Sequence, residues 1–110
     1  MIVTLKGEAN NYWTTSSAGI YVLGPYLVND RPHWLQDPGS KAIWYSEDAK
    51  TWAIGLQNDL GGFLFSINSL DEVAGPLEAT TWKYYDGKKW VSTSDDIMVD
   101  TFTGNRSFIF

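Results

Sequence analysis

The sequence predicts a single, soluble, all-β domain that folds as an antiparallel sandwich or a small barrel. Short apolar runs rich in Val, Ile, Thr and aromatic residues alternate with clusters of Gly, Pro, Asn, Asp and Ser, as strands alternate with turns. The many short runs favour this class over a fold in which strands alternate with long helices. A chain of 110 residues, 44% of them hydrophobic, is large enough for one core and too short for two. We therefore expect one domain over residues 1–110.

The expected strands are short, and Gly, Pro, Asn, Asp or Ser separates each from the next. They cover residues 2–6, 18–23, 33–36, 42–46, 51–54, 63–67, 80–85, 89–92, 97–103 and 107–110. Asp86-Gly87 lies between two aromatic runs and is the strongest hairpin signal in the chain.

One segment has helical signals. Ser69-Leu70-Asp71-Glu72 matches a capping box, and Gly75 and Pro76 follow it as stop signals. The pattern predicts at most one short helix, from Ser69 to Ala74.

Most of the tryptophans are expected in the core. In the run around Trp82, alternation places Trp82 and Tyr84 on one face and Lys83 on the other, and the lysine ammonium requires water. The same argument predicts burial of a further set of side chains: Trp44, Trp52, Ile54, Phe63, Phe65, Ile67 and Trp90.

Tyr12 and Trp13 stand apart, because they lie in a polar segment without apolar periodicity. Trp13 either closes one end of the core or lies on the surface as part of an aromatic contact patch. Stacked aromatic rings suit sugars and extended peptides, which combine apolar faces with polar edges. The surface interpretation gives four candidate ligand-binding residues: Tyr12, Trp13, Tyr26 and Tyr85.

The charge distribution restricts the partners. The net charge of −5 and scattered basic residues argue against nucleic acid and against anionic membranes. No apolar run approaches the ~18 residues of a membrane span, and the start of the chain lacks the features of a signal peptide. Without cysteine, neither disulfides nor Cys-based metal sites form. A complete chain of this kind is expected in the cytoplasm, whereas an excised module is compatible with an extracellular location.

No set of residues predicts catalysis. His33 is the sole histidine, with Asp30 and Asp37 in flanking turns, and we expect it at a strand entry where its ring meets water or a carbonyl. Asp95, Asp96 and the nearby Asp100 lack the ligand spacing of calcium loops. We therefore expect no catalytic residue, no metal and no cofactor, and a protein that is not an enzyme.

The order of the aromatic motifs resembles a tryptophan-rich β module. The motifs are Gly19-Ile20-Tyr21, Asn29-Asp30-Arg31-Pro32-His33-Trp34, Ile43-Trp44-Tyr45, Trp52-Ala53-Ile54-Gly55 and Trp82-Lys83-Tyr84-Tyr85-Asp86-Gly87-Lys88-Lys89-Trp90. Such modules occur, often repeated, in large multidomain proteins of invertebrates and unicellular eukaryotes. The resemblance implies a non-enzymatic recognition role and assigns no site residue, and this chain lacks the cysteines frequent in the family.

Two functions follow as hypotheses. The first is a binding or adhesion module that recognises a carbohydrate or a protein surface through exposed aromatic residues. The alternative is a structural subunit of a larger particle, which self-associates through terminal strands at residues 1–5 and 108–110. Unpaired apolar edge strands invite such pairing.

Overall fold

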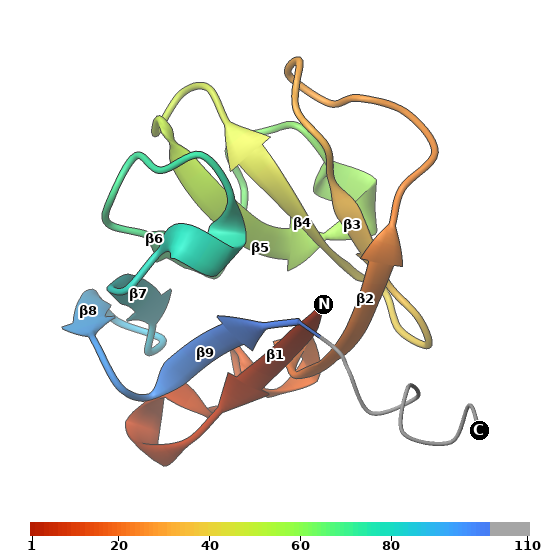
Figure 1. The fold of residues 1–110 in the computed structure, drawn as a ribbon. Helices are drawn as coiled ribbons and strands as arrows, with labels where there is room; N and C mark the ends of the chain where they lie inside the picture. Colours follow the sequence, from red (N-terminus) through yellow and green to blue (C-terminus); the bar gives the residue numbers. More distant parts are fainter. Residues whose placement is uncertain (102–110) are drawn as a thin grey trace.

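The computed structural model describes residues 1–101, which form an antiparallel sheet of nine strands curled into a nearly closed barrel (Figure 1). The strands are β1 (Ile2–Leu5), β2 (Gly19–Leu23), β3 (Trp34–Gln36), β4 (Lys41–Ser46), β5 (Thr51–Leu56), β6 (Ile67–Ser69), β7 (Trp82–Tyr85), β8 (Trp90–Thr93) and β9 (Ile97–Asp100). Their order in the sheet is β8-β7-β6-β5-β4-β3-β2-β1-β9. The predicted all-β class is confirmed, while the strand expected at 107–110 lies outside the described residues.

Within residues 1–101 the helical segments are single 3₁₀ turns. They are η1 (Gly7–Ala9), η2 (Thr15–Ser17), η3 (Gln57–Asp59) and η4 (Pro76–Glu78). The helical turn predicted from Ser69 to Ala74 is wrong. Ser69 ends β6, and its hydroxyl accepts a hydrogen bond from the Trp52 amide and donates one to the Asp71 carbonyl. The hydroxyl that would have capped a helix therefore links strands instead.

One face of the sheet forms the main core. The β4–β5 register pairs Tyr45 with Trp52 and Ile43 with Ile54, so their side chains meet inside the barrel. Trp82 joins the same cluster from β7, while Lys83 faces away. The alternation argument is confirmed for these strands.

The outer face of β4 and β5 is also covered. Trp44 lies on that face with Ala42 and Ala53, and its indole nitrogen donates to the Gly62 carbonyl at 3.1 Å. The segment 57–66 crosses over this face, with Phe65 packed against the cluster. Both faces of the two strands are therefore buried.

The same crossing overturns the strand predicted over 63–67. Strand β6 begins only at Ile67, which is buried as predicted. Phe65 is partly buried, but Phe63 is 70% exposed and not in the core. The chain turns at Gly61-Gly62, and the residues that follow cover β4 and β5 instead of forming a strand.

The prediction that Trp90 is buried is also wrong, because its side chain is 41% exposed. The β7–β8 hairpin pairs Tyr85 with Trp90 across the four residues 86–89. Paired residues share a face of the sheet. Trp90 therefore lies on the outer face with Tyr85, and Val91 faces inward opposite Tyr84.

Strand β1 is paired on both sides, with β2 and with β9. It is therefore not an exposed edge, which removes the premise for self-association through residues 1–5. The other proposed edge, 108–110, lies outside the described residues. Of the helical segments in residues 1–101, none has the length and apolar character needed to cross a bilayer.

Candidate functional site

Five aromatic side chains form a continuous row on the outside of the barrel. Successive ring centroids lie 5.3, 5.6, 5.8 and 6.1 Å apart, in tilted or edge-to-face geometry. The row, called the aromatic strip below, runs through Tyr12, Trp13, Tyr85, Trp90 and Phe65. It gathers residues from three distant segments of the chain.

A tight polar turn presents Tyr12 and Trp13 to solvent. The Asn11 side chain accepts a hydrogen bond from the Trp13 amide at 2.7 Å, and the buried Thr14 hydroxyl accepts one from the Asn11 amide at 3.0 Å. Tyr12 is 85% exposed and Trp13 48% exposed. The turn is organised by its polar residues, and the two rings project outward.

The turn is fastened to the β7–β8 hairpin. The Asn11 amide group donates to the Tyr85 carbonyl at 3.3 Å. Gly87, with φ +102°, lies directly beneath the Trp13 indole, where a β-carbon would overlap the ring nitrogen. Glycine is required here both by the positive φ and by the close approach. Trp13 is therefore held in a defined position although half of it is exposed.

The hairpin itself is stabilised by Asp86. Its carboxylate accepts hydrogen bonds from the backbone amides of Lys88 at 2.8 Å and Lys89 at 2.9 Å. The bonds from Lys89 and then Lys88 hold the pKa of Asp86 below its ordinary value. The predicted Asp86-Gly87 turn thus supports the part of the strip formed by Tyr85 and Trp90.

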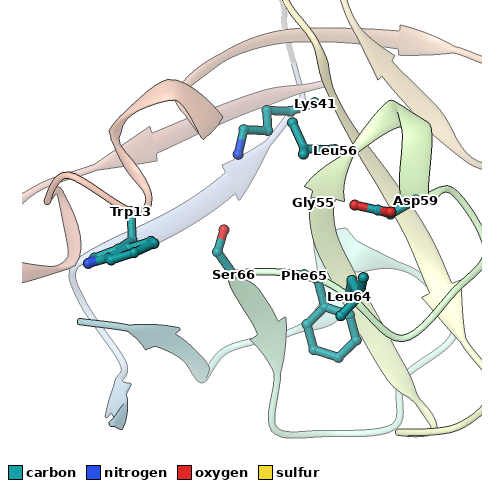
Figure 2. Close-up of a pocket in the computed structure, with 8 residues that line it drawn as sticks. All are labelled: Trp13, Lys41, Gly55, Leu56, Asp59, Leu64, Phe65 and Ser66. Atoms are coloured by element: carbon teal, nitrogen blue, oxygen red, sulfur yellow. The ribbon is translucent and has the colours of Figure 1, made fainter. Parts of the chain in front are cut away.

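A cavity of about 280 Å³ adjoins the strip between Trp13 and Phe65 (Figure 2). Its remaining apolar lining comes from Gly55, Leu56 and Leu64, and its polar lining from Lys41, Asp59 and Ser66. Figure 2 shows the Lys41 ammonium and the Ser66 hydroxyl pointing into the space from two sides. Strip and cavity together form one continuous surface.

The two polar groups aimed into this cavity are unusual. Lys41 is only 9% exposed, and desolvation lowers the pKa of its ammonium, with no carboxylate of residues 1–101 counteracting the shift. The Ser66 hydroxyl is buried and has no hydrogen-bond partner among the described residues. Buried polar groups are normally satisfied, so the unpartnered Ser66 hydroxyl beside Lys41 makes this cavity a candidate binding site.

The Lys41 shift predicts a pH dependence of stability. The pKa of Lys41 in the folded state lies below its ordinary value of 10.5, so as the pH rises the folded protein loses this proton before the unfolded chain does. The contribution of Lys41 to the free energy of unfolding therefore rises as the pH increases from its pKa in the folded state to its pKa in the unfolded state. We expect Lys41→Met to be at least as stable as wild type near neutral pH, with its advantage shrinking at about pH 9.5.

Urea denaturation of both proteins at the two pH values measures this difference. Burial also lowers the pKa of the Met1 amino group, but this group is present in both proteins, so its contribution to stability cancels in the comparison. An unchanged difference between the two proteins would show that Lys41 titrates normally.

Tyr26, the fourth predicted site residue, lies elsewhere. It follows the end of β2, whereas Trp13 precedes its start, so the two are at opposite ends of that strand. Tyr26 is exposed and its ring lies 5.1 Å from that of His33. His33 is fully buried beside Gly24, with no hydrogen-bond partner for either ring nitrogen among residues 1–101. The expected contact with a carbonyl or with bulk water is therefore contradicted, whereas the expected position at a strand entry is confirmed, because β3 begins at Trp34.

A more polar hollow of about 350 Å³ lies beside β4. Its main groups are engaged internally: the Arg31 guanidinium lies 3.8 Å from the Tyr45 ring centroid, and the Tyr45 hydroxyl donates to Glu72 at 2.7 Å. That bond to Glu72, followed by burial, raises the pKa of Tyr45. These groups stabilise the β2–β3 connection, which leaves the strip and its cavity as the better candidate site.

Sequence reasoning missed Trp90 and Phe65 of the strip and Lys41 and Ser66 of the cavity. Trp90 could have been found, because a four-residue loop puts Tyr85 and Trp90 on the same face. Lys41 and Ser66 carry no local signal and are brought together only by the barrel. In residues 1–101, no group of three or more His, Asp or Glu is placed to hold a metal ion.

No protein-family model, curated protein or solved structure matches this chain. A functional interpretation therefore depends on the chemistry of the surface itself.

Proposed function

We propose that this domain is a non-enzymatic binding module that recognises carbohydrate through the aromatic strip. The observation that carries the proposal is the row of five rings in mutual contact, with Tyr12 almost fully exposed and Trp13 half exposed. A contiguous aromatic row in which Tyr12, Trp13 and Trp90 are exposed is uncommon on a protein surface unless it binds something.

Several features of the surface favour a sugar ligand. Aromatic faces complement the apolar faces of sugar rings, and polar side chains beside them complement hydroxyl groups. Asn11 lies under one end of the strip, and the Lys83 ammonium lies 5.6 Å from the Trp90 ring centroid. The strip also leads into a cavity whose size is at the lower end of those that hold small ligands. An oligosaccharide can thus place one residue in the cavity and others along the rings.

The first test is Trp13→Ala. Because half of the ring is already in water, we expect the free energy of unfolding to change by about 1 kcal/mol or less. Loss of stacking, on the order of 1 kcal/mol per contact, should weaken glycan binding several-fold. A glycan array, with melting temperatures measured in parallel, checks both effects.

Tyr26→Ala is the matched control, since it also removes an exposed ring but lies outside the strip. Equal binding losses in both variants would contradict a site at the strip. A Trp13→Ala protein that melts many degrees lower would make Trp13 a structural plug. If the domain binds proteins on a protein array but no glycan, its target is a protein surface and the carbohydrate proposal is wrong.

A further inference from the structure

The cavity beside the strip has one cationic group in its lining, Lys41, with the Asp59 carboxylate on the far side. Lys41 is more than nine-tenths buried, and Figure 2 shows its ammonium directed into the space between Trp13 and Ser66. A charge withdrawn from water is unfavourable unless an opposite charge or hydrogen bonds compensate. The cavity is therefore suited to an anionic group that can pair with Lys41.

Ser66 gives an independent indication at the same place. Its hydroxyl is buried, lines the cavity and has no hydrogen-bond partner among residues 1–101. A hydroxyl can donate to an oxygen anion while the ammonium supplies the charge. Lys41 begins β4. Ser66 precedes β6, and its backbone is hydrogen-bonded to Ile54 of β5 and to Tyr85 of β7, so the fold holds both donors in place.

We propose that the cavity binds the carboxylate of an acidic sugar residue, with Lys41 and Ser66 as the donors and the Trp13 ring as the apolar wall. This assignment rests on the proposed carbohydrate-binding function and specifies its ligand class. The remainder of the glycan lies along the aromatic strip.

The charges around the cavity favour a carboxylate over a more highly charged group. Lys41 is the single cationic residue in its lining, and Asp59 on the far side offsets that charge. The domain as a whole carries a net charge of −5, which repels polyanions. One cation, a nearby carboxylate and a negatively charged domain together favour a ligand with a single negative charge, such as a carboxylate on a sugar ring. A cluster of sulfate or phosphate groups requires several cations.

The experiment uses a glycan array with three forms of ligand. Uronic-acid and sialic-acid glycans are printed beside the same glycans with the carboxyl reduced to an alcohol, and beside sulfated glycans. Wild type should prefer one or more carboxylated glycans over their reduced forms by about tenfold or more, the effect of a charge-assisted hydrogen bond. Lys41→Met should abolish this preference, and Ser66→Ala should reduce it several-fold.

Two variants isolate the role of Lys41. Lys6→Met makes the same change of charge at an exposed position and should leave the preference intact. Lys41→Met should retain residual binding to the reduced glycans through the strip, which would show that the variant is folded and that its sugar site is present. Melting temperatures provide a second check of folding.

The failures of the two proposals are distinguishable. Equal binding of carboxylated and reduced glycans, sensitive to Trp13→Ala, would overturn the carboxylate assignment and leave the carbohydrate function standing. Preference for sulfated glycans would overturn the assignment in favour of another anion. Absence of binding to every glycan would overturn both.

Discussion

Trp52→Ala is expected to lower the free energy of unfolding by about 3–5 kcal/mol, the range for removing a large aromatic side chain from a core. The Trp52 ring packs against Tyr45 at 5.6 Å and Trp34 at 5.9 Å between centroids. Its indole nitrogen also donates to the Val73 carbonyl at 2.9 Å, which the substitution would leave unpaired. Domains of this size have only about 5–15 kcal/mol to lose, so the variant should be largely unfolded near 37 °C.

The same loss is expected for Trp82→Ala, because Trp82 is equally buried on the inner face. Trp90→Ala is the matched control, since it deletes an identical side chain from the outer face. Its contacts with Phe65 and Tyr85 should contribute only about 1 kcal/mol. Urea denaturation of the three variants gives the comparison, and equal losses would contradict the assignment of inner and outer faces.

Gly24→Ala is expected to destabilise the domain by about 1–3 kcal/mol, the usual effect of overpacking. A β-carbon at Gly24 would overlap the imidazole of His33. That ring is fully buried and packs beside Tyr26, so it has little freedom to move aside. The effect comes from the His33 ring, because Gly24 is not among the residues with positive φ.

A double-mutant cycle tests this cause. His33→Ala removes the ring, so Gly24→Ala should be far less harmful in that background. Gly75→Ala is the control substitution, since its new β-carbon would meet only the end of the Glu78 side chain, which is exposed and can rotate away. Thermal or urea unfolding measures each variant, and additive losses in the cycle would show that the two positions do not clash.

The inner face of the barrel could be predicted from sequence because its signal is local. Lys83 between Trp82 and Tyr84 assigns each residue to a face, and Asp86-Gly87 marks the hairpin. In the candidate site, the polar segment around Tyr12 and Trp13 indicated a turn for the same reason, and exposure of its rings was one of two alternatives that the sequence left open. Asn and Thr side chains close such a turn themselves, and no apolar neighbour in the sequence covers the rings.

The remaining features depend on contacts between distant segments. Local pattern predicted a strand at Phe63 and a helix at Ser69. In the structure the segment around Phe63 covers the outer face at Trp44, and the Ser69 hydroxyl accepts a hydrogen bond from the Trp52 amide. The conformation of both segments depends on their contacts with β4 and β5, which are distant in sequence and so leave no signal in the local pattern.

By itself, the sequence determined the all-β class, the buried alternation of Trp52 and Trp82 and the polar turn at Tyr12–Trp13, because strand period and turn chemistry are local properties. It left open whether Trp13 lies on the surface or closes the core. Only the tertiary structure decided that Tyr85, Trp90 and Phe65 extend those rings into a strip and that Lys41 faces Ser66 across a cavity. The reason is physical: hairpin register and barrel closure bring these groups together, and both are set by packing of the whole sheet.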